Sequence, residues 1–323
     1  MTYKLTKSLA SLCLFSCLLV VLPERAAAWG GKGHRVVAEI AWSKLAGTRA
    51  LAEVKTILGG DLNSFLDAST WPDTVRFPGS AFSYADNWHF VSIPRTSAAY
   101  NQPTQCKTKV TVPNTGGTQV NNCVVGALDY ASAVLRDPAS TPQRRTVALK
   151  FIVHFVGDLH QPLHASEDTQ FNNHKGTKGD RGGNYRFVCF LGKCKASGKN
   201  LNLHSTWDTY MIVHRMLLDR IADEAAYAAA VGAATPQLFT AAELAAVEGG
   251  APADWATEAH LVAREFAYRL PPSKPKVGQG GQTFKFNDVT KQYYDENIRR
   301  VDRQLARAGL RLAEYLKGIF PEQ

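Results

Sequence analysis

Apolar residues recur at helical spacing along most of the chain. Apolar positions three and four residues apart, with polar residues between them, predict amphipathic helices. The clearest such stretches are residues 34–46, 123–137, 144–160, 205–222 and 293–320. Segments rich in Gly, Pro, Asn and Thr separate them, such as residues 93–122 and 174–184, and these are predicted to be loops. The pattern therefore predicts a mainly α protein.

One segment departs from this helical pattern. Residues 184–194, NYRFVCFLGKC, are rich in the aromatic and β-branched residues of strands, and we predict a short hairpin there. The rest of the chain contains no internal repeat, low-complexity tract or linker. We therefore expect a single compact helical domain over residues 29–323, with a short hairpin and long loops.

The first 28 residues have the pattern of an export signal. Lys4 and Lys7 precede an apolar stretch at residues 9–22, and RAAAWG supplies the small residues of an A-x-A cleavage site. We expect cleavage after Ala28, which makes Trp29 the new N-terminus. No other apolar run is long enough to cross a bilayer, so no membrane anchor is expected. The mature protein is predicted to be soluble and exported, either to a periplasm or to the medium.

Charge and cysteine content refine this picture. Loss of residues 1–28 changes the 37 basic and 28 acidic residues to 34 and 27, a net charge of +7. Such a charge suits a polyanionic partner such as nucleic acid or an anionic membrane, but it also suits a secreted protein with excess lysine. Four cysteines remain, which in an exported chain indicates two disulfides. The simplest of the three connectivities is Cys106–Cys123 and Cys189–Cys194. The absence of an N-x-[ST] sequon favours a bacterial source.

The stretch HFVGDLHQPLH, residues 154–164, has the residue types of a metal site. His154 and Asp158 are four residues apart, so they share one face of a helix. His164 follows Pro162, where the helix is expected to break and turn the His164 side chain back. A His/Asp pair at this spacing is a compact chelate for a divalent ion with nitrogen and oxygen ligands, most often zinc.

The stretch HSTWD repeats this spacing with His204 and Asp208. One such pair alone is more simply a hydrogen-bonded core histidine and a capping aspartate. Two pairs together with His164 favour a metal site, because burying several unpartnered ionisable groups is costly and a bound metal removes that cost.

Three other fragments offer further ligands. Asp73 lies in STWPDTVR and His89 lies in NWHFVSI. The mature terminus, WGGKGHR, begins with Trp29, whose free amine and carbonyl oxygen could chelate a metal in a five-membered ring, and His34 follows within reach. Each fragment is weak alone.

Taken in order, these motifs resemble one family. The chain resembles the zinc-dependent, single-strand-specific nucleases of the S1/P1 type. The motifs that carry the resemblance are, in order, WG and GH, WPD and R, HF, HFVGDLHQPLH, GGN and HSTWDTY. These nucleases are related in fold to bacterial zinc phospholipases C. The resemblance extends over essentially the whole mature chain.

The resemblance implies a cluster of three zinc ions per chain. The implied ligands are Asp73, His89, His154 and Asp158 for the first ion, His164, His204 and Asp208 for the second, and Trp29 and His34 for the third. Asp158 would bridge the first and third ions. Each ion then has three or four protein ligands and positions open to water and phosphate, as a catalytic site requires.

The implied reaction is endonucleolytic cleavage of RNA and single-stranded DNA to 5′-phosphate nucleotides, with 3′-nucleotidase activity. A hydroxide that bridges the first and third ions is expected to attack phosphorus in line, and the second ion is expected to stabilise the departing 3′-oxygen. Arg76 and Asn184 match family positions beside the scissile phosphate, although each also fits a surface or turn residue. Phe90 matches a base-stacking position.

Some residues leave the interpretation open. Many family members have an acidic residue soon after HF, whereas this chain has Ser92 and Arg95, so base preference is not predicted. Lys175, Lys178 and Arg181 would either grip the nucleic acid backbone or form a solvated loop. We interpret His160 as a surface residue or a partner of a ligand histidine, and His174, His214 and His260 as ordinary histidines.

Two other functions compete with a nuclease. A phospholipase C-like enzyme could use the same trinuclear zinc frame, but that group tends to have glutamate at the position of Asp208. A structural zinc protein commonly uses cysteine thiolates, and the cysteines here are better explained as disulfides. We therefore expect a monomeric nuclease whose substrates are single-stranded nucleic acid and nucleotides.

Overall fold

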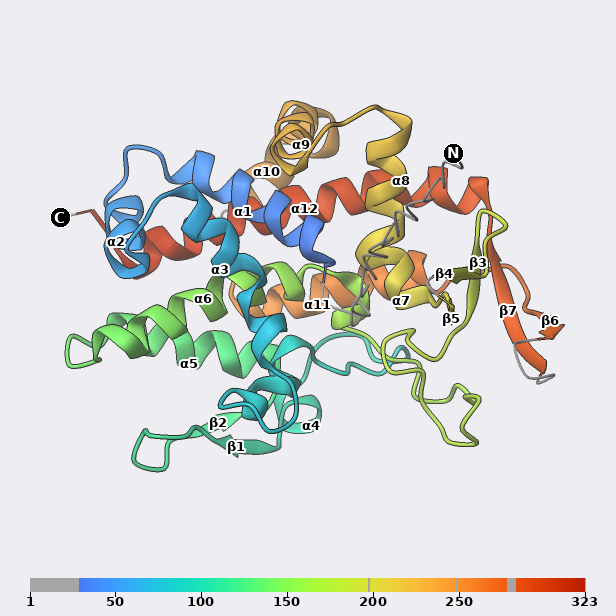
Figure 1. Cartoon of the computed structure of the whole chain (residues 1–323), viewed down its shortest axis with the longest axis horizontal. Coiled ribbons are helices and arrows are strands. Elements are labelled where there is room, and N and C mark those ends of the chain that lie inside the picture. Colours follow the sequence, from blue (N-terminus) through green and yellow to red (C-terminus); the bar gives the residue numbers. More distant parts are fainter. Residues whose placement is uncertain (1–28, 197, 248, 278–282, 323) are drawn as a thin grey trace, which may run out of the picture.

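The computed structural model describes residues 29–196, 198–247, 249–277 and 283–322. The predicted export signal, residues 1–28, lies outside the described residues. Helices make up most of the described chain, which confirms the mainly α prediction, and the few strands are short (Figure 1).

The long helix α12 (Lys291–Ile319) crosses the molecule and organises its core (Figure 1). Helices α1 (Gly31–Leu45), α6 (Pro142–Leu159) and α9 (Glu224–Leu238) pack against it. One face of α12 supplies buried apolar side chains at helical spacing, including Val301, Leu305 and Leu312. Burial of these side chains stabilises the bundle at about 25 cal/mol for each Å² of apolar surface removed from water.

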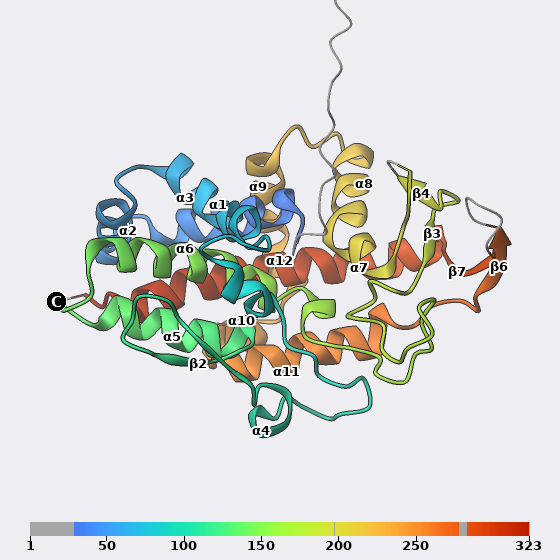
Figure 2. The same ribbon diagram turned by 60° about the horizontal axis from the view of Figure 1, so that its bottom comes forward.

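Two further helices pack against α6. Helix α5 (Val124–Arg136) packs along α6, and α3 (Leu62–Val75) packs against both α1 and α6 (Figure 2). The sequence pattern did not predict α3, because Pro72 lies inside it and its apolar spacing is weak. The Asp61 side chain caps its N-terminus by accepting from the Asn63 N–H, and burial of its apolar face outweighs the proline.

The remaining helical elements are short. They are α2 (Arg49–Leu58), α4 (Gln102–Gln105), α7 (Leu203–Ser205), α8 (Met211–Leu218), α10 (Ala241–Val247), α11 (Pro252–Val262), the 3-10 turns η1 (Ser83–His89) and η2 (Pro162–His164), and the π-helical turns η3 (Thr206–Tyr210) and η4 (Ala263–Ala267). Helix α6 ends at Leu159 and η2 follows, so the predicted break before His164 is confirmed. Turn η3 interrupts the predicted helix 205–222, which ends at Leu218 as α8.

The strands correct one prediction and refine another. Residues 93–122, expected to be a loop, contain α4 and an antiparallel pair, β1 (Lys109–Thr111) and β2 (Gln119–Asn121). The predicted hairpin within residues 184–194 is present but short: Phe190 and Lys193 exchange two backbone hydrogen bonds, at 2.8 and 2.9 Å, across a tight turn. The main partner of strand β3 (Val188–Phe190) is instead the distant β7 (Thr283–Val289), which runs parallel to it and pairs with β6 (Lys274–Val277). A second small pair comprises β4 (Lys195–Ala196) and β5 (Lys199–Asn200).

Two disulfides hold the long connections in place. Cys106 pairs with Cys123, and Cys189 pairs with Cys194, so both predicted pairings are confirmed. The first bond ties the segment of α4 to the start of α5, and the second closes the turn after β3. Within the described ranges, no helix has the length and apolar character needed to span a membrane.

Candidate metal centre

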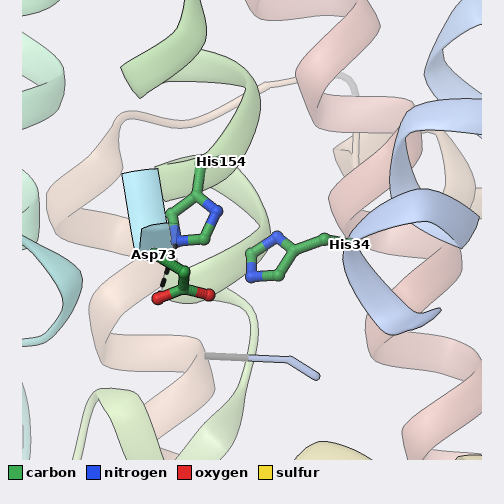
Figure 3. A group of neighbouring side chains, drawn as sticks. All are labelled: His34, Asp73 and His154. Carbon is green, nitrogen blue, oxygen red and sulfur yellow. Dashed lines mark ion pairs between the residues drawn. The ribbon is translucent and has the colours of Figure 1, made fainter. Parts of the chain in front are cut away.

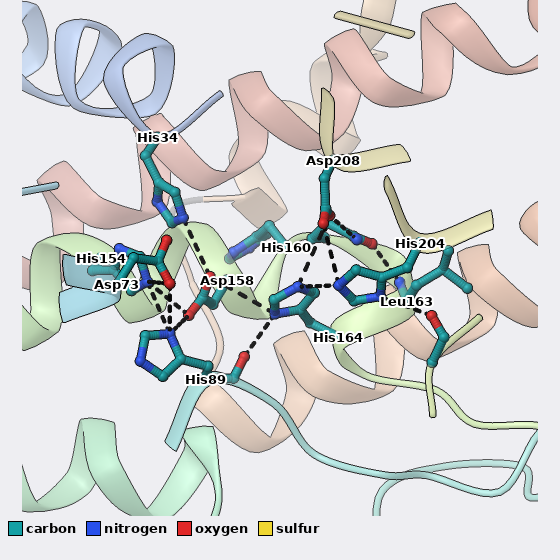
Figure 4. A network of polar contacts seen from close by, with 12 residues as sticks. His34, Asp73, His89, His154, Asp158, His160, Leu163, His164, His204 and Asp208 are labelled. Carbon is teal, nitrogen blue, oxygen red and sulfur yellow. Dashed lines mark hydrogen bonds and ion pairs between the residues drawn. The ribbon is translucent and has the colours of Figure 1, made fainter. Parts of the chain in front are cut away.

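Histidines and aspartates from distant elements converge beside the C-terminal half of α6 (Figure 4). Helix α6 supplies His154 and Asp158, and the turn η2 after it supplies His164. The other members are His34 of α1, Asp73 of α3, His89 of η1, His204 of α7 and Asp208 of η3. The structure therefore brings together every side chain that the sequence suggested as a metal ligand, apart from the special case of Trp29.

The first group consists of His89, His154 and Asp158, all buried. Oδ2 of Asp158 lies 3.0 Å from Nδ1 of His89 and 3.1 Å from Nε2 of His154. The two ring nitrogens lie 3.0 Å from each other. Three potential ligand atoms thus face one point, as tetrahedral coordination requires.

His34 and Asp73 adjoin this group, and with His154 they offer ligand atoms that all lie within 4.8 Å of one another. His34 stacks on His154 with ring centroids 3.9 Å apart, and its Nε2 lies 3.3 Å from Oδ1 of Asp158 (Figure 3). Oδ1 of Asp73 lies 3.6 Å from Nδ1 of His89 and 3.8 Å from Nε2 of His154. The Asp158 carboxylate therefore directs one oxygen to the first group and the other to His34, which is the arrangement of a bridging ligand.

His164, His204 and Asp208 form a separate group, visible at the other end of the cluster in Figure 4. Nε2 of His204 lies 3.1 Å from Nε2 of His164 and 3.2 Å from Oδ2 of Asp208. Asp158 approaches this group as well, since its Oδ1 lies 3.7 Å from Nδ1 of His164. The four-residue spacing of His204 and Asp208 thus places both side chains on one face, as predicted.

Backbone carbonyls orient three of the histidine rings. In each ring Nδ1 faces a carbonyl oxygen, to which it must donate a proton, and Nε2 is then left with a lone pair. The pairs are His154 with Ser69 at 2.6 Å, His164 with His89 at 2.7 Å, and His204 with Gly182 at 2.8 Å. The Nε2 atoms of His164 and His204 consequently point lone pairs at each other. Two neutral rings in these tautomers cannot hydrogen-bond to each other through Nε2, whereas a cation between them would remove the repulsion.

Several buried polar atoms of the cluster have no hydrogen-bond partner within the described ranges. They are both carboxylate oxygens of Asp158, both ring nitrogens of His34, Nε2 of His89 and Oδ2 of Asp208. Each such group costs free energy when it is buried without a partner, and metal coordination would offset that cost. The donor set of imidazole nitrogens and carboxylates, without thiolates, fits zinc and similar divalent ions.

Burial shifts the pKa values of these groups. It lowers the pKa of His34 and of His204 to about 4, so both imidazoles are neutral near pH 7 and can bind a cation. It raises the pKa of Asp73 and of Asp158 to about 6, because a carboxylate charge without solvent is unfavourable. A bound divalent cation would remove that penalty and hold both carboxylates ionised.

Residues 29 and 30 lie beside Asp208. Trp29 is fully buried, and the Gly30 N–H donates to the Asp208 carbonyl at 2.9 Å. A side chain at Gly30 would not fit, since its Cβ would lie 2.3 Å from Oγ1 of Thr209. The backbone of residues 29 and 30 is therefore held next to η3, and His34 follows one turn into α1.

Two important residues were not recognised from sequence. Gln161 is fully buried; its side-chain amide donates to Oδ1 of Asp208 and its carbonyl accepts from the Leu163 N–H. Gly157 makes room for His34, because a Cβ there would lie 2.8 Å from Nδ1 of that ring. The only signal for either was its place inside HFVGDLHQPLH.

The three predicted substrate contacts lie around the cluster. Arg76 ends α3, with Nε 3.2 Å from Oδ1 of Asp73 and NH1 3.6 Å from Oδ1 of Asp86. Burial is the main cause of the lowered pKa of His89 and of His204, and the positive charge of Arg76 lowers both pKa values further. Asn184 donates from its side chain to the Arg181 carbonyl at 3.0 Å, so it also stabilises a turn. Phe90 is half-buried directly after His89.

His160 is not a surface residue, which corrects one of the two interpretations offered for it. It is buried, with Nδ1 donating to the Val156 carbonyl at 2.7 Å and Nε2 accepting from Arg311 at 3.1 Å. Arg311 in turn donates to both carboxylate oxygens of Glu258 at 2.8 and 2.9 Å. This network joins α6 to α12 and α11 behind the cluster.

Comparisons with known proteins agree with the geometry. A family model described as S1/P1 nuclease matches residues 29–321. Nuclease P1 of Penicillium citrinum is 26% identical over 300 residues, which cover 90% of this chain and 97% of the relative. Endonuclease 2 of Arabidopsis thaliana is 27% identical over 307 residues, 90% of each chain. Nuclease S1 of Aspergillus oryzae is 31% identical over 198 residues, which cover 61% of this chain and 58% of the relative.

Proposed function

Because this chain belongs to the S1/P1 nuclease family, we propose that it is a zinc-dependent endonuclease acting on RNA and single-stranded DNA. The products would be 5′-phosphate nucleotides, and 3′-nucleotides would also be substrates. The observation that carries the proposal is the close approach of Nε2 of His164 to Nε2 of His204, which lie 3.1 Å apart. A backbone carbonyl fixes each ring so that its Nε2 lone pair faces the other ring.

Three zinc ions would occupy the cluster. Their proposed ligands are Asp73, His89, His154 and Asp158 for the first ion, His164, His204 and Asp208 for the second, and the Trp29 amine and carbonyl with His34 for the third. Bridging by Asp158 accords with its two oxygens facing different groups at 3.0 and 3.3 Å. When bound, zinc supplies Lewis acidity toward the phosphate and activates water for attack on phosphorus.

The protein's own residues would position the substrate. Arg76 carries a permanent positive charge beside Asp73, from which it can pair with a non-bridging phosphate oxygen. The half-exposed face of Phe90 offers a surface for an unstacked base next to His89. Asn184 is held by its bond to the Arg181 carbonyl and keeps its side-chain oxygen for a further contact. Asp73 and Asp158 act as metal ligands that remain ionised.

Export and a free N-terminus are part of this proposal. Two disulfides fit an oxidising compartment outside the cytoplasm. Removal of residues 1–28 by a signal peptidase would expose the Trp29 amine at a place where its backbone is already held. The bacterial source, the choice between periplasm and medium, and the monomeric state stay predictions from sequence.

A side-by-side hydrolysis assay tests the function. The purified mature protein would be given single-stranded RNA, single-stranded DNA, duplex DNA, a 3′-nucleotide and phosphatidylcholine, with and without a zinc chelator. We expect chelator-sensitive release of 5′-nucleotides from the single-stranded polymers, and no lipid cleavage. Lipid cleavage without nucleotide release would overturn the proposal and favour a phospholipase C-like enzyme.

A second experiment tests the terminal chelate. A protein with one extra residue before Trp29 would lack the free amine at the proposed position. We expect it to bind one zinc ion fewer and to lose most of its activity. Unchanged zinc content and activity would contradict the role of Trp29 while leaving the other two sites standing.

A further inference from the structure

The loop before β3 carries a group of aromatic and basic side chains that the proposed active site does not use. Tyr185 lies at its centre, with Nζ of Lys175 4.9 Å and the guanidinium of Arg181 5.8 Å from its ring centroid. Arg181 also donates to the Tyr185 hydroxyl at 3.3 Å. The ring of His174 meets Tyr185 edge-on at 5.2 Å. His174, Lys175 and Arg181 are exposed and Tyr185 is half-buried, so the group faces solvent.

The loop is held rigidly, and its acidic residues are used internally. Arg186 donates to Asp180 at 3.1 Å and to Asp168 at 2.6 Å, and the Asp180 carboxylate also accepts from the Tyr268 hydroxyl at 3.2 Å. Asp180 is completely buried. The carboxylates of the loop therefore turn inward to Arg186, which leaves its exposed lysines and Arg181 as the outward charges. Glu167 accepts from the Arg181 backbone N–H at 3.3 Å.

The same loop is part of the metal centre. The Gly182 carbonyl holds the ring of His204 at 2.8 Å, and Tyr185 follows only three residues later. Three residues span at most about 11 Å between Cα atoms. The aromatic and basic side chains consequently lie within about one or two nucleotides of the His164, His204 and Asp208 group. The loop that carries them, which runs into β3, lies at the end of the molecule where β3, β6 and β7 are found (Figure 1).

We propose that Tyr185, Lys175 and Arg181 bind a nucleotide flanking the scissile phosphate, with the base against Tyr185 and the backbone phosphate between the two cations. This inference rests on the proposed nuclease function. Lys175 and Arg181 lie over the Tyr185 ring, with Nζ of Lys175 4.9 Å from its centroid. When the exposed Lys175 side chain turns from the ring to a phosphate, a base of any type can stack on the ring in its place. Bases inside a duplex cannot offer their faces to Tyr185, so this surface would favour single strands.

Comparison of long and short substrates tests the proposal. For Tyr185→Ala, we expect the KM for a single-stranded 20-nucleotide DNA to rise roughly 5- to 150-fold relative to the KM for a 3′-mononucleotide, which is the worth of one stacked base. Tyr185→Phe keeps the ring and should restore most of the affinity. The double variant Lys175→Ala/Arg181→Ala should flatten the salt dependence of the oligonucleotide KM, by about 0.7 in log–log slope for each phosphate that the protein no longer neutralises.

Lys55→Ala serves as a matched control. Lys55 also lies over an aromatic ring, 5.5 Å from the centroid of Trp42, but it belongs to α2 at the opposite end of the molecule (Figure 1). We expect its KM values to match those of the wild type. An equal loss on both substrates in Tyr185→Ala would mean that Tyr185 only supports Gly182, and it would overturn the proposal, as would unchanged KM values. A wild-type protein that hydrolyses neither substrate would instead refute the nuclease function.

Discussion

Gly157 offers a direct test of how tightly the metal centre is packed. This glycine lies in α6 between His154 and Asp158, with its Cα facing the ring of His34. The substitution Gly157→Ala would place a methyl group 2.8 Å from Nδ1 and 3.1 Å from Cε1 of that ring. The ring cannot easily retreat, because it is buried and stacked on His154 at 3.9 Å.

Two opposing terms set the effect on stability. Alanine favours a helix interior over glycine by about 0.8–1.0 kcal/mol. Overpacking a buried site costs about 1–3 kcal/mol. The metal-free protein should therefore lose between nothing and about 2 kcal/mol of its free energy of unfolding. The affinity for zinc should fall about 10- to 100-fold, because displacement of groups that orient metal ligands typically lowers metal affinity by that factor.

The assay compares zinc binding, activity and stability in one set of proteins. Zinc content would be measured in buffers of fixed free zinc concentration, with hydrolysis of single-stranded DNA and urea unfolding measured in parallel. We expect Gly157→Ala to lose one zinc ion first and to recover part of its activity when free zinc is raised. Wild-type zinc affinity and activity in this variant would refute the argument that His34 is a fixed ligand.

Gly232→Ala is the control for the helix term. Gly232 lies in α9, is exposed, and has no atom within 4 Å of an added Cβ. This variant should gain up to about 1 kcal/mol of stability, with unchanged zinc content and activity. A loss of stability there would show that the helix term has been overestimated at both positions.

Four further predictions address the centre and the fold. Asp158→Asn should abolish hydrolysis and lose bound zinc, because the two oxygens of this carboxylate face His34 and His89 at 3.3 and 3.0 Å; full activity would be incompatible with the cluster. Gln161→Leu removes the donor to Asp208 and should lower the affinity for one zinc ion about 10- to 100-fold, as seen in metal titration. Gly309→Ala places a Cβ 2.5 Å from the Cβ of Ile40 and would push α1 away from α12, so the free energy of unfolding in urea should fall by about 1–3 kcal/mol. Gly318→Ala, with no atom within 4 Å of its added Cβ, should not lower this free energy. Chelation of zinc should lower the melting temperature and re-addition should restore it, because each zinc site stabilises the folded state by about 2.7 kcal/mol when free zinc is at 100 times its Kd. A melting temperature insensitive to chelator would argue against buried zinc.

Local sequence determined those parts of the protein that depend on residues close together in the chain. The four-residue spacing in HFVGDLH and HSTWD was enough to place two His/Asp pairs on shared faces, because helical periodicity repeats every 3.6 residues. Pro162 was enough to end α6 and turn His164 back. The two disulfides joined neighbouring cysteines, 17 and 5 residues apart.

Tertiary structure decided which distant segments meet. The carbonyls of Ser69, His89 and Gly182 orient ligand rings that lie 85, 75 and 22 residues away, and no periodicity in the sequence indicates such a pairing. The parallel pairing of β3 with β7 could not be predicted for the same reason, whereas the tight turn between Phe190 and Lys193 could. Helix α3 forms despite Pro72 because burial between α1 and α6 outweighs local propensity. Residue types and local spacing therefore indicated the candidate metal ligands, whereas the packing of remote elements set their protonation and orientation.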